Sequence, residues 1–161
     1  MNEMPKEGEL APDFELRDDG GATHRLDDRR GHYTVVYFYP EDDTPGCTKE
    51  ACSFRDNHAE FQAADTEVWG LSPQGPESKQ AFRAKYGLPF TLLPDPEHRI
   101  ADLYGAWGEK MNYGRTYMGI IRSSWLVGPD GRVVRAWPKV KAEGHGLEVL
   151  AAVREAQVTP A

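Results

Sequence analysis

The chain has 161 residues, and 39% of them are hydrophobic. Its formal net charge is -7 at pH 7, and it contains two cysteines. This length supports one well-buried core and is too short for two comfortable domains, so we predict a single domain over 1–161 with its core at about 8–157. The negative charge, with no dense cluster of Lys and Arg, argues against nucleic acids and membranes as partners.

Residues 1–9 lack the basic and apolar regions of a secretory signal, and no apolar run approaches the ~18 residues that a membrane span needs. Two cysteines five positions apart are also a poor disulfide framework for a secreted fold. We therefore expect a cytoplasmic protein. In that reducing compartment, such a pair is more often catalytic than structural.

The first half of the chain predicts an N-terminal β-hairpin and then a strand–helix–strand unit. The turn signal Asp18-Asp19-Gly20-Gly21 supports the hairpin, and the strand–helix–strand order favours parallel pairing of its two strands. The expected elements are hairpin strands at 14–16 and 24–26, a buried strand at 33–39, a helix at 47–64 and a strand at 67–72.

The second half contains further helix and turn signals. A helix should begin at Pro76 and end at Gly87, which suits the left-handed position after a helix. Asp95 and Pro96 predict the cap and first turn of a helix that closes at Gly105. The other expected elements are a strand at 92–93, an ordered loop at 107–117, hairpin strands at 121–127 and 133–137, and a helix at 147–157. This order predicts an α/β fold with a mixed central β-sheet flanked by helices on both faces.

Both cysteines lie in the stretch 39–52, where a strand, a loop and a helix start meet. The first turn of a helix carries unpaired N–H groups and a partial positive charge, which stabilise a thiolate over a thiol. At ~100° per residue, Cys47 shares a helix face with Phe54 and Phe61, whereas Cys52 points roughly 140° away. A free cysteine can simply fill a core, but packing does not require a second, outward one. Cys47 is therefore a candidate nucleophile.

The pattern Pro40-x-x-x-Thr44-x-x-Cys47 resembles the active-site motif of the peroxiredoxins, in particular the bacterioferritin-comigratory-protein or PrxQ type. Cys52 stands where many members of this type carry a resolving cysteine. Trp125 departs from the smaller aromatic or aliphatic residue expected there. The resemblance implies a thioredoxin-like fold and extends over nearly the whole chain, through the segments 10–14, 86–90, 119–123 and 140–145.

This resemblance implies a thiol-dependent peroxidase that reduces hydrogen peroxide and organic hydroperoxides. The Cys47 thiolate would become a sulfenic acid, and Cys52 would condense with it to an intramolecular disulfide. Thioredoxin or a similar dithiol protein would then reduce that disulfide. No haem, flavin or metal cofactor is required, and neither the histidines nor the cysteines have the spacing of a zinc site. Because this type is often monomeric, we expect a monomer.

Three further residues complete the candidate catalytic site. The Thr44 hydroxyl can bind the thiolate or a substrate oxygen, and Pro40, which has no N–H, can shield the pocket from water. Arg122 lies in an otherwise apolar segment where a strand would leave it partly buried. The residues alone slightly favour a salt bridge for it, but the resemblance implies contact with Cys47. Glu50 could either orient Arg122 or support the helix N-terminus by its charge.

Two other function classes stay open. A thiol–disulfide oxidoreductase shares the thioredoxin fold but carries C-x-x-C at the helix start, whereas four residues separate Cys47 from Cys52. A redox-sensing or chaperone-like binding module would use Cys47 only to report oxidation. Peroxide consumption with a thioredoxin system, insulin reduction and client-aggregation assays distinguish the three.

Overall fold

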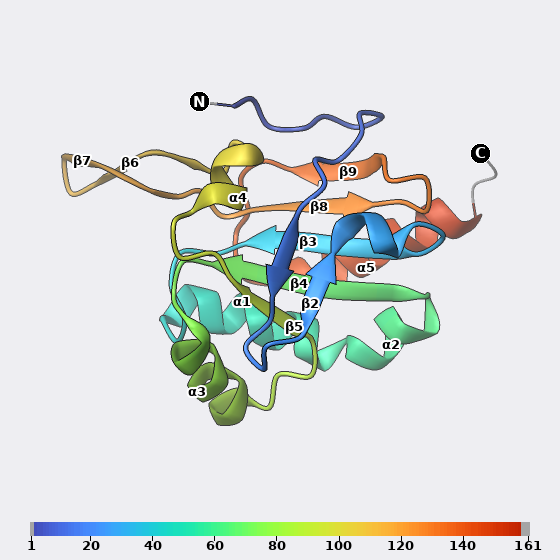
Figure 1. Ribbon diagram of the computed structural model, residues 1–161, viewed down its shortest axis with the longest axis horizontal. Helices are drawn as coiled ribbons and strands as arrows, with labels where there is room; N and C mark the ends of the chain where they lie inside the picture. Colours follow the sequence, from blue (N-terminus) through green and yellow to red (C-terminus); the bar gives the residue numbers. More distant parts are fainter. Residues whose placement is uncertain (1, 159–161) are drawn as a thin grey trace.

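A five-stranded mixed sheet forms the centre of the fold (Figure 1). The computed structural model describes residues 2–158. Across the sheet the strands are β5 (Thr91–Pro94), β4 (Thr66–Ser72), β3 (Tyr33–Phe38), β8 (Ser123–Val127) and β9 (Val133–Trp137). β3 pairs in parallel with β4 and antiparallel with β8. The predicted parallel strand–helix–strand unit is confirmed.

Helices cover both faces of this sheet. One face packs against α1 (Pro45–Asp56), α2 (His58–Ala63), α3 (Pro76–Tyr86) and α5 (His145–Val158). The other packs against α4 (Arg99–Leu103), the 3-10 helix η1 (Leu26–Arg29) and the hairpin β1 (Glu15–Arg17)–β2 (Thr23–Arg25). Because side chains alternate along a strand, Tyr37 joins the core around Phe54 while its neighbour Val36 joins the core around Phe14. The predicted mixed sheet and N-terminal hairpin are confirmed.

Helix α3 agrees with its predicted limits. Pro76 is its first residue, where a missing N–H leaves no intrahelical bond unmade. Gly87 follows it with a φ of 62° and donates its N–H to Arg83 O. None of the helices within residues 2–158 combines the length and the apolar character needed to cross a bilayer.

The single helix expected at 47–64 is wrong, because two helices occupy this region. α1 begins at Pro45, two residues before the predicted start, and ends at Asp56. The side chain of Asn57 donates to Ser53 O at 2.8 Å and so competes with the backbone ladder. α2 then starts at His58.

The helix start predicted from Asp95 and Pro96 is placed too early. α4 begins only at Arg99, and Pro96 lies in the turn before it. The Asp95 carboxylate nevertheless accepts the N–H groups of Ile100 and Ala101 at 3.1 and 3.0 Å. Asp95 thus supplies the predicted capping interaction from outside the first turn.

The ordered loop expected at 107–117 is a β-hairpin. Its strands are β6 (Trp107–Asn112) and β7 (Arg115–Ile120), and it projects beyond the end of the central sheet (Figure 1). Tyr113 and Gly114 form the turn with φ values of 51° and 77°. Much of the hairpin is exposed on both faces, so no alternation of apolar residues marks it.

Candidate active site

The two cysteines lie on different sides of α1. Cys47 is the third residue of the helix and is 2% exposed, packed in the core that contains Phe54. Cys52 is half-buried, and both thiols are free. The predicted inward and outward orientations of the two cysteines are confirmed.

Arg122 joins Cys47 to a buried carboxylate. One terminal nitrogen of its guanidinium donates to Cys47 Sγ at 3.3 Å, and the other donates to Glu50 Oε1 at 2.6 Å. The salt bridge favoured by the residues and the cysteine contact implied by the resemblance therefore coexist. A Cβ on Gly46 would lie 3.1 Å from the guanidinium, so glycine at this position gives Arg122 room to approach.

The predicted strand position of Arg122 is wrong. It lies with Ile121 in the two-residue link between β7 and β8, since β8 begins at Ser123. A link between two strands can turn a side chain out of the sheet, whereas a strand residue must follow the alternation of the pleat. This position lets the guanidinium reach the start of α1.

Glu50 is fully buried on α1, and its carboxylate orients Arg122. Burial raises the pKa of Glu50 to about 7, although Arg122 opposes this shift. Burial disfavours the charge of Arg122, but Glu50 and Cys47 outweigh it and raise the pKa of Arg122. The guanidinium therefore keeps its positive charge beside Cys47.

Thr44 and Pro40 belong to the loop that leads into α1. Thr44 immediately precedes the helix, and its hydroxyl donates to Glu41 O at 2.9 Å. No hydrogen bond joins Thr44 to Cys47 within residues 2–158. Pro40 is half-buried, and its carbonyl accepts the side-chain amide of Gln74 at 3.1 Å.

Lys110 is a second cation near Cys47 that the sequence pattern does not reveal. Its Nζ donates to Ile120 O at 2.8 Å. Burial and the charge of Arg122 lower the pKa of Lys110, whereas Cys47 raises it. A cavity of about 500 Å³ opens beside these groups and is lined by Glu109, Lys110, Met111, Ile121, Arg122, Lys139 and Val140.

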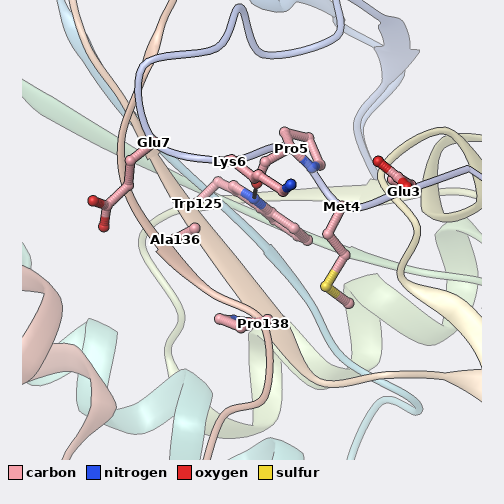
Figure 2. Close-up of a pocket in the computed structure, with 8 residues that line it drawn as sticks. All are labelled: Glu3, Met4, Pro5, Lys6, Glu7, Trp125, Ala136 and Pro138. Carbon is pink, nitrogen blue, oxygen red and sulfur yellow. Dashed lines mark hydrogen bonds between the residues drawn. The ribbon is translucent and has the colours of Figure 1, made fainter.

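A larger cavity of about 690 Å³ lies on the opposite face of the sheet (Figure 2). The N-terminal segment 3–7 crosses it, and the indole of Trp125 and the side chain of Met4 face it. Trp125 is fully buried and donates its Nε1–H to Pro5 O at 3.0 Å. None of the five predicted site residues lines this cavity.

A metal centre finds no support in the described part of the chain. Among residues 2–158, no group of three or more His, Cys, Asp or Glu side chains is arranged to hold a metal ion. The buried His145 instead pairs with Ser124 Oγ and Glu148 Oε1, at 2.8 Å each.

Comparison with known proteins relates this arrangement to a family. Residues 8–136 match the model of the AhpC/TSA family. Peroxiredoxin Bcp of Bacillus subtilis (strain 168) is 46% identical over 148 residues, which cover 92% of this chain and 94% of that protein. The protein is a peroxiredoxin of the AhpC/TSA family. Peroxiredoxin Bcp of Escherichia coli (strain K12) is 41% identical to it over 155 residues, 96% of this chain and 99% of the relative.

Solved structures resemble this peroxiredoxin over most of its length. The bacterioferritin comigratory protein of Xanthomonas campestris has a TM-score of 0.84 and 38% identity, covering 89% of this chain and 91% of its own. PrxQ of Xylella fastidiosa has a TM-score of 0.89 and 31% identity, covering 95% and 98%. The peroxiredoxin thus has the thioredoxin-like fold and is of the bacterioferritin-comigratory-protein or PrxQ type.

Proposed function

We propose that Cys47 is the peroxide-reducing cysteine of this thiol-dependent peroxidase. The contact of 3.3 Å between Arg122 and Cys47 Sγ carries the proposal, because a thiolate needs a fixed positive partner. The Cys47 sulfur attacks the terminal oxygen of the peroxide, and the O–O bond breaks. Sulfur is oxidised to a sulfenic acid, while the other oxygen takes up a proton and leaves as water or an alcohol. Arg122 stabilises the negative charge that develops on that leaving oxygen.

The substrates we propose are hydrogen peroxide and organic hydroperoxides. The cavity beside Arg122 has apolar walls from Met111, Ile121 and Val140, which suit an alkyl group. The relative from Xanthomonas campestris is described for its alkyl peroxide reduction activity. Thr44 would accept a hydrogen bond from the peroxide, since its own proton is given to Glu41 O. Pro40 would shield the reacting atoms from water.

Cys52 completes the proposed cycle. Its sulfur attacks the sulfenic acid of Cys47, the S–O bond breaks, and water leaves as the intramolecular disulfide forms. The half-buried position of Cys52 favours access for thioredoxin or a similar dithiol protein, which would reduce the disulfide by thiol–disulfide exchange. No metal or organic cofactor takes part.

The same mechanism leads to a proposal for the oligomeric state of the protein. A disulfide within one chain needs no second subunit, so we propose a monomer in which one domain, with its core at about 8–157, carries the whole reaction. We also propose a cytoplasmic location, where a thioredoxin system would be available.

Peroxide-dependent oxidation of NADPH, in the presence of thioredoxin and thioredoxin reductase, tests the proposed cycle. The wild type should turn over hydrogen peroxide and cumene hydroperoxide, whereas Cys47→Ser should be inactive because a hydroxyl cannot supply the attacking anion. Cys52→Ser should react once, gain one oxygen atom by mass, and fail to recycle. Turnover near the wild-type rate by Cys47→Ser would contradict the assignment. Insulin reduction without peroxide turnover would favour a thiol–disulfide oxidoreductase instead.

Arg122→Met tests the contact on which the assignment depends. Removing one hydrogen-bond donor that stabilises developing negative charge typically lowers a rate by about 10²–10³, and we expect Arg122→Met to slow the reaction with peroxide by about this factor. Arg115→Met, at an exposed position on β7, is the matched control and should react as the wild type does. Equal rates for the two variants would show that Arg122 serves only as a salt bridge to Glu50.

A further inference from the structure

Lys79, on α3, has no exposed side-chain surface, an environment in which an ammonium group is rarely found unpaired. Its Nζ lies 3.3 Å from both carboxylate oxygens of Asp42 and also donates to Ser72 Oγ. The side chain of Asp42 is itself only 2% exposed. Burial lowers the pKa of Lys79 to about 8, although Asp42 opposes the shift. The chemistry proposed for Cys47 does not use this ion pair.

Asp42 is the centre of a wider hydrogen-bond network. Tyr39 OH donates to its Oδ1 at 2.5 Å, and Ser78 Oγ donates to its Oδ2 at 2.7 Å. Gln74 Oε1 accepts the Asp42 N–H, and Gln74 Nε2 donates to Pro40 O, both at 3.1 Å. The loop that follows β3 is therefore bound through its side chains and its backbone.

The next loop residue, Asp43, is bound to the same helix. Its φ of 60° is uncommon for a residue other than glycine. Lys85 Nζ and Tyr86 OH, both on α3, hold its carboxylate at 2.9 and 2.6 Å. A strained backbone of this kind persists only where the surrounding structure fixes it. Two successive aspartates thus attach the loop to α3.

This loop determines where the reacting groups lie. It connects β3 to α1, with Thr44 directly before the helix and Cys47 as the third helical residue. A misplacement of about 1 Å at a reacting centre can lower a rate about 10²-fold. Among the described residues, the side chains of Asp42 and Lys79 form their hydrogen bonds with each other and with Tyr39, Ser72 and Ser78, and none with Cys47, Thr44 or Arg122. The pair is therefore connected to the reacting groups through the loop.

We propose that Asp42 and Lys79 are positioning residues of this peroxidase: their buried ion pair fixes the loop 40–44 against α3 and the end of β4, so that Cys47 and Thr44 meet the peroxide in a reactive geometry. The inference rests on the function proposed for Cys47. A contribution to folding stability does not by itself explain a buried ion pair, because replacing such a pair with apolar groups is often neutral or stabilising.

The double variant Asp42→Asn/Lys79→Met tests the positioning role, because it removes both charges without leaving either unpaired in the core. Stopped-flow measurement should show the reaction of Cys47 with hydrogen peroxide slowed about tenfold or more. Alkylation of Cys47 by iodoacetamide at the same pH should keep its wild-type rate, since Arg122 still stabilises the thiolate and alkylation needs no aligned peroxide. This contrast distinguishes positioning from a general loss of structure.

Two single variants support the measurement. Gln74→Ala removes two contacts to the loop backbone and leaves no buried charge, so it should fold and show a smaller loss in the peroxide reaction alone. Arg83→Met is the matched control on α3, because Arg83 pairs with Asp19 one helical turn further along. It should keep both wild-type rates. The melting temperature of each variant checks that it is folded.

Several outcomes overturn the inference. These are wild-type peroxide rates in the folded double variant, parallel losses in the peroxide and alkylation rates, or an equal loss in Arg83→Met. If the double variant does not fold, the peroxide rate of Gln74→Ala is the deciding measurement. A wild-type peroxide rate in Gln74→Ala also overturns the inference. If the wild type consumes no peroxide, the proposed function itself fails. An active wild type with unaffected variants removes only the positioning role.

Discussion

Arg122 donates hydrogen bonds to two acidic groups, the sulfur of Cys47 and the carboxylate of Glu50. Glu50 is buried where an ionised carboxylate is disfavoured, and Arg122 only partly compensates. The orientation of Arg122 is therefore obtained at a cost in folding stability that depends on pH.

This dependence gives a prediction for unfolding. The pKa of Glu50 rises from 4.5 to about 7 on folding. Between these values the native protein binds a proton that the unfolded chain has released, so the free energy of unfolding falls as pH rises through this range. The shift corresponds to on the order of 3 kcal/mol. Glu50→Gln cannot ionise, so the wild type should lose about this much stability relative to the variant between about pH 4.5 and pH 7.

Urea unfolding across this pH range measures the difference between the two proteins. Glu77→Gln, at an exposed carboxylate in the first turn of α3, is the control and should follow the wild type at every pH. Parallel curves for the wild type and Glu50→Gln would mean that the pKa of Glu50 is the same in the folded and the unfolded chain, with Arg122 fully compensating its burial.

The residues of the site were predictable to different degrees. Cys47 could be selected as a nucleophile from its place at a helix start. Its contact with Arg122 joins positions 75 residues apart, and only the family resemblance implied it. Lys79 and Asp42 lie 37 residues apart, and neither stands out from the many charged residues of the chain. A pair that forms only in the folded core leaves no local pattern in the sequence.

At the scale of elements, α1 is the part of the fold that must change during the proposed cycle. Residues five apart on an α-helix have Cα atoms about 8–9 Å apart, whereas a disulfide requires about 4.4–6.8 Å. The C-terminal half of α1 is held by α5: Gly146 N–H donates to Ser53 Oγ at 3.0 Å, and a Cβ on Gly146 would clash with the Ser53 backbone. Phe54 is fully buried. Unwinding should therefore stop near Ser53.

Amide hydrogen exchange tests this limit. On oxidation, exchange should accelerate across Thr48–Cys52, because these residues must leave the helix to join the two sulfurs. It should change little across Ser53–Asp56 and across α3, which serves as the internal control. Equal protection of Thr48–Cys52 in both redox states, with the disulfide established by mass, would contradict local unwinding.

Local signals predicted the limits of α3 but placed the start of α4 too early, and elements without such signals were missed. Pro76 and Gly87 mark the ends of α3 by backbone chemistry that does not depend on the rest of the fold. The hairpin of β6 and β7 has no buried face of its own, so its sequence lacks the period of a strand. The break at Asn57 coincides with one side-chain hydrogen bond to Ser53 O, which helical periodicity does not report.

For the molecule as a whole, the central sheet separates the reactive cysteine from the packing of the N-terminal segment. Cys47 and α1, which carries it, pack on one face, and Arg122 reaches Cys47 from the link between β7 and β8. The other face holds Trp125, which packs edge-on against Phe38 and Tyr104 with ring centroids 5.8 and 5.2 Å away. Its hydrogen bond to Pro5 O attaches the N-terminal segment to β8. This contact accounts for a tryptophan where the family resemblance suggested a smaller side chain.

Trp125→Phe should therefore lower stability without changing the chemistry. The variant loses the hydrogen bond to Pro5 O and leaves a small cavity, a loss of about 1–3 kcal/mol in the free energy of unfolding. Urea unfolding measures this loss.

Trp107→Phe is the control for the stability measurement. Trp107 is only half-buried, and its ring stacks on that of His98 with the centroids 3.7 Å apart. Its substitution changes less buried volume, so it should lower the free energy of unfolding by less. The reaction of Cys47 with peroxide should keep its wild-type rate in Trp125→Phe, because the sheet separates the two sites. A slower reaction in the folded variant would show instead that packing on one face is transmitted through β8 to the adjoining Arg122.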